Sequence, residues 1–144
     1  MLDPKYIAGL FDGEGCIGQN FTNTGFRVLQ VSISNNYKPV LDDLKLQFGG
    51  GVYPLNKCFQ WRIGAADDIF VFLTAVSPHL FIKKAEAAVA LAISQTVGSG
   101  GRLTDQTILL RERLFDMLTE AGDRRKSFRE EVNEHVAEVQ HDSD

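Results

Sequence analysis

The sequence predicts an α+β domain, and three observations predict it. Residues 26–34 and 59–63 alternate apolar and polar side chains, as half-buried strands do. Several other segments repeat apolar residues at helical spacing, and clusters of glycine or asparagine separate these segments. The 144 residues suit a single domain with a real core. Within 1–144 we expect a core over 4–97, a helical part over 103–139 and a disordered tail over 140–144.

The first predicted helix begins after Asp3, which can cap it, and has Pro4 at its first position. It ends in Asp12-Gly13-Glu14-Gly15, where both glycines can take a positive φ and stop the helix. The carboxylates therefore lie at a helix C-terminus, which already carries partial negative charge. Because a bound cation would stabilise them there, this turn is a candidate cation site.

Small residues mark one side of the same helix, at Ala8, Gly9 and Gly13. A glycine inside a helix costs about 1 kcal/mol relative to alanine. Small residues four positions apart allow two helix backbones to approach closely. We therefore predict that this helix packs against another helix. The alternative is an ordinary first helix followed by a glycine-rich turn.

Two strands are expected next, over 16–23 and 26–34, with a turn at Asn23-Thr24-Gly25. The second strand places Leu29, Val31 and Ile33 on one face, which we assign to the core. The opposite face carries the amide and hydroxyl groups of Gln30, Ser32 and Ser34. Such groups can read base edges in a DNA major groove, but any solvated strand carries them too.

The middle of the chain predicts a helix from Pro39 to Phe48, ended by glycines 49–51, and then a hairpin. The hairpin strands are 52–55 and 59–63, with a turn at Asn56-Lys57. In the second strand we expect Cys58, Gln60 and Arg62 to face away from the core. A third helix follows, capped by Asp67 or Asp68 and ended by Ser77-Pro78.

The C-terminal third predicts three more helices. The first begins at Lys83-Lys84 and runs to about Thr96, and a glycine-rich linker spans 97–102. Thr104 can cap the next helix, which we end at Gly122, and Ser127 with Glu130 has the spacing of a capping box for the last. A basic cluster can either contact DNA phosphates or balance nearby acids; it consists of Arg124, Arg125, Lys126 and Arg129. We expect His135 and His141 to be solvent-exposed and not ligands.

Charge and composition narrow the class of protein. The net charge is −4, but residues 1–84 hold eight basic and seven acidic side chains, and residues 85–144 hold seven and twelve. The acidity therefore lies in the C-terminal part, whereas nucleic-acid binders gain from basic surfaces. No apolar run reaches the length of a membrane span and no signal peptide is visible, so we expect an intracellular protein with no membrane partner. Cys16 and Cys58 lack metal-site spacing, and we expect them reduced, although a bridge between them stays open.

Residues 7–15, Ile7-Ala8-Gly9-Leu10-Phe11-Asp12-Gly13-Glu14-Gly15, resemble the LAGLIDADG motif, which names a family of homing endonucleases. The direct matches are Ala8, Gly9, Leu10, Asp12 and Gly15. The conservative replacements are Ile7, Phe11 and Glu14, and Gly13 stands for a small alanine. The order of predicted elements over residues 4 to about 97 also resembles that fold, an α-β-β-α-β-β-α arrangement with an antiparallel four-stranded saddle sheet and helices on one face.

The resemblance implies a site and an assembly. Because the motif occurs once, it implies a homodimer joined through the first helices, at Ala8, Gly9, Asp12 and Gly13. It implies that Glu14, beside Gly13, binds a divalent cation, Mg²⁺ or another such as Mn²⁺ or Ca²⁺, over the scissile phosphates. Lys83 matches the family's basic residue near the cleavage centre. The family often has Gln followed by Lys after the second strand; this chain has Ser34-Asn35-Asn36, and Asn35 is the nearest equivalent of the Gln.

The function implied is site-specific, metal-dependent cleavage of double-stranded DNA at a long, roughly palindromic target. The side chains expected on the DNA are Gln30, Ser32, Ser34, Gln60, Arg62 and Lys57. A non-cleaving relative that binds intron RNA or regulates DNA is the first alternative. A metabolic or structural dimer without nucleic acid is the second, and the acidic composition favours it.

Overall fold

The structure is a computed structural model that describes residues 1–96 and 103–142. In chain order the elements are α1 (Pro4–Glu14), β1 (Gly15–Phe21), β2 (Arg27–Asn35), α2 (Lys38–Phe48), β3 (Gly51–Pro54), β4 (Phe59–Ile63), α3 (Ala66–Val76), a 3-10 turn η1 (Ser77–His79), α4 (Lys84–Gln95) and α5 (Asp105–Asp142). The predicted α+β class and the order of elements through α4 are confirmed. The predicted linker over 97–102 lies outside the described residues.

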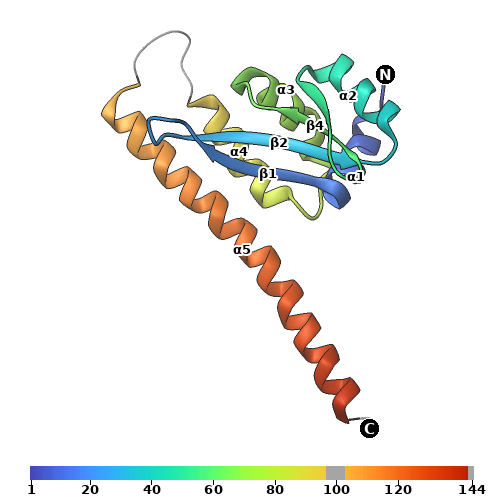
Figure 1. The fold of residues 1–144 in the computed structure, drawn as a ribbon. Coiled ribbons are helices and arrows are strands. Elements are labelled where there is room, and N and C mark those ends of the chain that lie inside the picture. Colours follow the sequence, from blue (N-terminus) through green and yellow to red (C-terminus); the bar gives the residue numbers. More distant parts are fainter. Residues whose placement is uncertain (97–102, 143–144) are drawn as a thin grey trace.

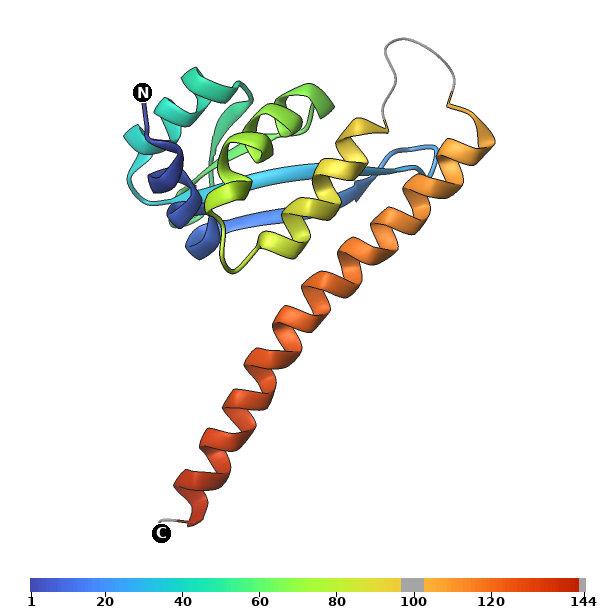
Figure 2. The ribbon, with the colours of Figure 1, turned by 180° about the vertical axis from the view of Figure 1, so that it is seen from behind.

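The four strands form one antiparallel sheet in the order β1-β2-β4-β3. Seen from opposite sides in Figures 1 and 2, helices α1 to α4 lie on one face of this sheet and leave the other face uncovered. The covered face carries Leu29, Val31 and Ile33 from β2 with Trp61 and Ile63 from β4, all buried. The alternation in the sequence therefore assigned the two faces correctly.

Aromatic rings fill the space between the sheet and the helices. Phe72 of α3 lies at the centre, with ring centroids 5.3 Å from Phe11, 5.1 Å from Phe48 and 5.0 Å from Trp61. The Trp61 indole also donates a hydrogen bond to the carbonyl of Gly49, at 2.9 Å. Edge-to-face packing of this kind adds to the burial of apolar area. The core thus fixes α1 and α3 against β4 and determines where α1 ends.

Helix α1 has the predicted cap and ends within the predicted turn. Asp3 accepts a hydrogen bond from the main-chain N–H of Lys5, at 2.7 Å. The helix ends at Glu14 with Gly15 as its C-cap, but neither Gly13 nor Gly15 has a positive φ, so the expected left-handed ending is wrong. Gly15 is needed for space, because a Cβ there would lie 2.0 Å from the ring of Phe11. The predicted capping of α3 is also wrong: Ala65 is its N-cap, and Asp67 and Asp68 lie in its first turn.

Helix α5 corrects the largest expectation. Thr104 caps it by accepting from the N–H of Thr107, at 3.2 Å, but the two predicted helices are one helix of 38 residues. Gly122 and Ser127 lie inside it, and it includes residues 140–142 of the expected tail, whereas 143 and 144 lie outside the described residues. Gly122 passes close to α4, since a Cβ there would lie 3.8 Å from Glu86 Oε2.

The first half of α5 is docked on the domain. Phe115 and Leu118 are buried, and Arg27 of β2 pairs with Glu112 and Asp116, at 2.5 and 2.9 Å. Hydrogen bonds from Arg27 to these two acids raise the pKa of its guanidinium. The second half projects past the body of the domain into solvent (Figures 1 and 2). No helix in the described part of the chain is long and apolar enough to cross a membrane.

Candidate functional site

Glu14 is the last residue of α1, and its side chain is exposed. Its carboxylate Oε2 accepts a hydrogen bond from Nδ2 of Asn35, the last residue of β2, at 2.7 Å. Asn35 is oriented in turn, because its Oδ1 accepts from the main-chain N–H of Tyr37, at 2.8 Å. This second bond requires the amide nitrogen to face Glu14. The acid is therefore held by a neutral donor, and no ion pair neutralises it within the described residues.

Asp12 fastens the segment before α4 to the end of α1. Its two carboxylate oxygens accept from the main-chain N–H groups of Phe81, at 2.7 Å, and Lys83, at 3.0 Å. The Lys83 ammonium donates back to the main-chain carbonyl of Asp12, at 2.8 Å. A helix C-terminus leaves such carbonyls unpaired, so the lysine satisfies one of them. The structure therefore brings Glu14, Asn35 and Lys83 to the same end of α1.

Lys83 is the N-cap residue of α4 and is only 4% exposed. Its Nζ lies 5.9 Å from the centroid of the Phe11 ring. Burial lowers the pKa of this amine, and the positive charge of Arg125 lowers it further, against the opposing effects of Glu86 and Asp12. A lysine in such surroundings loses its proton more readily than one in water.

Glu86 and Arg125 form an ion pair at 2.7 Å that joins α4 to α5 beside Lys83. Glu86 is 5% exposed, and sequence reasoning gave it no role. The sequence did contain a signal for it. Glu86 lies at helical spacing from Ala90 and Ile93, so it is an acid on a helix face that is otherwise buried and apolar, where an ion-pair partner is expected. Arg125 belongs to the predicted basic cluster, and here it balances an acid of another helix. The side chain of Arg129 lies outside what the structure describes, as does that of His141.

The uncovered sheet face carries the polar residues predicted for it. The strand register places Ser32 opposite Cys16 and Arg62, Gln30 opposite Gly18, and Ser34 opposite Gln60. Six of the residues on this face line a polar concavity: Cys16, Gly18, Gln30, Ser32, Gln60 and Arg62. Arg62 stacks 4.6 Å above the Tyr53 ring and donates from Nε to Gln60, and Gln60 donates to Ser34 at 3.3 Å. The face is thus rich in hydrogen-bonding groups that are already oriented.

Lys57 lies in the β3–β4 turn and is exposed. Because Phe59 at the start of β4 pairs with Asn35, this turn leaves the sheet at the end where Glu14 lies. The polar face, the acid and Lys57 therefore adjoin one another.

The predicted dimer residues divide into two sets. Gly9 and Gly13 are exposed, and a Cβ on either would meet nothing within 4 Å. Ala8, in contrast, is completely buried in the core of its own domain, and Asp12 is engaged by Phe81 and Lys83. Only Gly9 and Gly13 are therefore free to meet a second helix, and the expectation for Ala8 is corrected.

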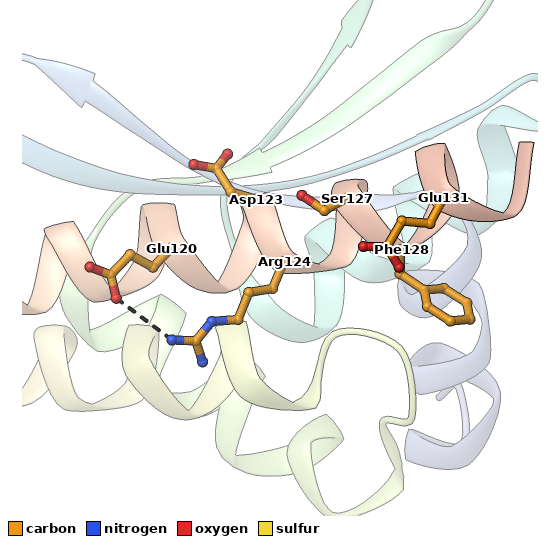
Figure 3. Close-up of a pocket in the computed structure, with 6 residues that line it drawn as sticks. All are labelled: Glu120, Asp123, Arg124, Ser127, Phe128 and Glu131. Atoms are coloured by element: carbon orange, nitrogen blue, oxygen red, sulfur yellow. Dashed lines mark ion pairs between the residues drawn. The ribbon is translucent and has the colours of Figure 1, made fainter. Parts of the chain in front are cut away.

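No group of three His, Cys, Asp or Glu side chains that could hold a metal occurs in the described part of the chain. The Asp12 carboxylate at the same end of α1 is engaged by the N–H groups of Phe81 and Lys83, so in one protomer Glu14 is the acid there that is not bonded to the main chain. A second concave surface lies on the middle of α5. Its side chains all come from that helix: Glu120, Asp123, Arg124, Ser127, Phe128 and Glu131. Figure 3 shows these side chains and the ion pair between Arg124 and Glu120. This surface lies on the middle of α5, and among the described residues no hydrogen bond or ion pair links its side chains to Glu14.

Neither protein-family models nor the sequences of curated proteins match this chain. Solved structures do match it. The homing endonuclease I-CvuI in complex with its target superposes with a TM-score of 0.65 and 17% identity, over 83% of this chain and 79% of that one. The homing endonuclease I-TnaI gives 0.61 and 23%, over 83% of this chain and 98% of that one. The LAGLIDADG meganuclease I-AabMI bound to uncleaved DNA gives 0.66 and 19%, over 78% of this chain and 43% of that one.

These likenesses establish the fold: the chain has the fold of LAGLIDADG homing endonucleases, as residues 7–15 predicted. The chain spans most of I-CvuI and I-TnaI but less than half of I-AabMI.

Proposed function

We propose that this protein is a LAGLIDADG homing endonuclease that cleaves double-stranded DNA at a specific site, as a homodimer and with a divalent cation. The observation that carries the proposal is the placement of Glu14. This exposed acid is held by Asn35 at the end of α1 and adjoins a polar sheet face that no helix covers. The solved structures of the same fold include complexes of homing endonucleases with DNA.

The residues present suit a hard divalent cation. Glu14 offers carboxylate oxygens, and the carbonyl of Gly13 lies in the last turn of a helix, where partial negative charge accumulates. Mg²⁺ keeps several waters and needs only one or two carboxylates when substrate phosphates complete its shell, so a lone acid in each protomer fits. Glu14 and Gly13 would hold such an ion, which supplies stabilisation of the attacking and leaving oxygens in an in-line displacement. I-CvuI was crystallised with DNA in the presence of calcium and of magnesium.

Asn35 and Lys83 have separate roles in this proposal. Asn35 fixes the Glu14 carboxylate and can orient solvent with the same amide that accepts from Tyr37. Lys83 is held beside the acid through the carbonyl of Asp12, and its lowered pKa makes it suitable for polarising a water or accepting a proton. Both side chains lie at the same end of α1 as Glu14, and a phosphate bound beside Glu14 would lie near them.

The open sheet face would lie on the duplex. Gln30, Gln60 and Arg62 carry the bidentate groups that read adenine and guanine in a major groove. Ser32 and Ser34 add short hydrogen-bonding groups, and Lys57 in the adjacent turn would contact a phosphate.

The free side of α1 supports the homodimer. Gly9 and Gly13 are exposed with open space around them, which allows two α1 helices to approach closely and brings two copies of Glu14 together. This chain covers 79% of I-CvuI and 98% of I-TnaI but only 43% of I-AabMI. These shares support a protomer that holds a single domain of this fold. A two-fold assembly of this kind calls for a roughly palindromic target.

A second candidate function is a relative that binds nucleic acid without cleaving it. The observation that favours it is the state of Lys83. This side chain is buried, and its ammonium is hydrogen-bonded to a main-chain carbonyl, so it is not exposed to a substrate. In addition, Arg62 is the one basic side chain among the residues that line the concavity on the uncovered sheet face.

One experiment separates these functions. The protein is incubated with Mg²⁺ and a library of randomised duplexes, and both the bound fraction and the cut ends are sequenced. We expect cut ends that share one long, roughly palindromic sequence, and Glu14→Gln should remove the cuts while the bound sequences persist. Asp43→Asn, an exposed acid on α2, is the matched control and should cut normally. Enrichment without cuts supports the non-cleaving relative, and no enrichment rejects both.

A further inference from the structure

The outer half of α5, residues 126–142, has an apolar side that nothing in the described residues of the protomer covers. Beyond Arg125, which pairs with Glu86, the described side chains of this segment are exposed, and Figures 1 and 2 show the helix running clear of the domain. The exposed fractions are large for apolar residues: 68% for Phe128, 45% for Val132, 49% for Val136 and 61% for Val139.

These four residues form a single stripe. Their spacings of four, four and three positions place them within one side of an α-helix, as in the seam of a coiled coil. The same line continues toward the domain through Ala121, two turns before Phe128, and Met117, which is 46% exposed. A projecting helix that is polar elsewhere gains most of its stability from packing such a stripe, because short isolated helices are marginal in water.

The charges beside the stripe indicate what covers it. Arg124 and Lys126 lie at the end of the segment nearer the domain and Glu138 lies near its far end, whereas Glu130, Glu131 and Glu134 lie close to Val132 in the middle. Two such helices side by side in the same direction would place like charges together at both ends. In opposite directions, the basic end of each helix lies beside Glu138 of the other. The two ends of the segment therefore favour a reversed copy of itself.

We propose that the outer half of α5 pairs in antiparallel orientation with the same segment of a second copy of this chain, with Val132 near the two-fold axis. In this register Phe128 lies opposite Val136 of the partner helix, and Arg124 comes within one turn of Glu138. Arg124 is free to make this contact, because its pair with Glu120 is long, at 3.9 Å, and both side chains are largely exposed (Figure 3).

The length of the helix permits this arrangement. With Val132 at the centre, residues 126–138 of one helix overlap residues 138–126 of the other, which spans about 20 Å at 1.5 Å per residue. The docked half of each α5 ends at Arg125, just before that overlap, so the two domains are attached at opposite ends of the paired segment. The pairing uses none of the residues to which the proposed function gives a role in binding DNA, metal or a second α1 helix, so it stands or fails independently of that function.

The test measures the mass of the full chain by sedimentation equilibrium, in a Gly9→Leu background that blocks the α1 face. We expect Val132→Glu in this background to weaken dimerisation at least tenfold. Ala137→Glu is the matched control, because it adds the same charge to the opposite side of the same paired segment, five residues later, where the residue is also exposed. Circular dichroism of each variant checks that α5 is retained.

Disulfide trapping then tests the direction. In a Cys16→Ser/Cys58→Ser background, Phe128→Cys and Val136→Cys proteins are mixed and oxidised, with one of them carrying a mass tag. The antiparallel pair gives disulfides between positions 128 and 136. Disulfides only between identical positions would overturn the proposal in favour of a parallel pair. A monomer in the Gly9→Leu background, or a dimer that Val132→Glu leaves unchanged, would overturn the proposal altogether.

Discussion

The amide of Asn35 holds the carboxylate of Glu14 at 2.7 Å, so the end of β2 determines the orientation of the acid at the end of α1. Asn35 is itself fixed by the N–H of Tyr37. The Glu14 carboxylate is therefore held in one orientation by these hydrogen bonds, although its side chain is exposed. Removing a residue that hydrogen-bonds to a metal ligand commonly lowers metal affinity or activity by about 10- to 100-fold.

This relationship predicts the effect of Asn35→Ala. We expect cleavage to fall by about tenfold or more because Glu14 loses its donor, while the affinity for DNA changes little. Asn35→Asp should be worse, because it keeps the acceptor for Tyr37 but places a second negative charge against Glu14. Single-turnover cleavage and equilibrium binding of the same duplex check both variants. Equal cleavage by Asn35→Ala and the parent protein would show that the hydrogen bond has no part in the chemistry.

Lys83 gives a prediction about pH. Its pKa lies below the ordinary 10.5, chiefly because of burial and then because of Arg125. The unfolded chain therefore binds a proton that the folded chain has lost, so the stability of the parent relative to Lys83→Met should rise with pH in the alkaline range below 10.5. Urea unfolding of both proteins across that range measures the difference. A difference that is constant with pH would mean that the amine titrates as it does in water.

Arg125 should control the same titration from α5. We expect Arg125→Met to raise the pKa of Lys83, because it removes a nearby positive charge and leaves Glu86 without its partner. The double change Glu86→Gln/Arg125→Met removes both charges and should return the pKa part of the way. NMR titration of the Lys83 side-chain signals reads this directly. Arg124→Met, one position earlier and exposed, is the control that should leave the titration unchanged.

The sequence was sufficient for features that depend on local pattern. The alternation in 26–34 and 59–63 assigned both faces of the sheet, and the pattern of residues 7–15 identified the fold. It was insufficient where distant contacts overrule local signals. Gly122 and Ser127 look like a helix end and a helix start, yet α5 continues through both because Arg125 is anchored to Glu86. That anchor joins residues far apart in the chain, so no periodicity in either segment could predict it.

Gly15 and Gly13 differ in what an added methyl group would meet. A Cβ on Gly15 would lie 2.0 Å from the Phe11 ring and 2.6 Å from the Phe11 carbonyl, so Gly15→Ala should destabilise the domain by about 1–3 kcal/mol, as overpacking does. Gly13→Ala meets nothing within 4 Å in the protomer. It should be neutral or should stabilise the helix by up to about 1 kcal/mol. Thermal unfolding at low protein concentration compares the two, and equal losses would refute the packing explanation.

The uncovered sheet face predicts two different responses to mutation. Arg62 is oriented by Tyr53 and Gln60 within the polar concavity, so Arg62→Gln should cost about 1–3 kcal/mol of binding to the target and should relax specificity at one base pair. Lys57 is exposed in a turn, and Lys57→Gln should weaken all duplexes alike and lower the slope of log K against log salt by about one. Lys5→Gln, on the N-terminal turn of α1, is the exposed control.

Gly9 predicts how the α1 face contributes to assembly. Because Gly9 is exposed with nothing around it, Gly9→Leu can be accommodated by a single protomer, where leucine is also the better helix former. If two α1 helices approach closely, the same side chain separates them, and both copies of Glu14 move apart. We therefore expect Gly9→Leu to leave the unfolding temperature of the protomer unchanged or higher, but to weaken the α1 contact and abolish double-strand cleavage. Lys5→Leu adds the same side chain four positions earlier, and comparing the two localises the contact. Full cleavage by Gly9→Leu would mean that a single protomer carries the activity, which the lone carboxylate of Glu14 argues against.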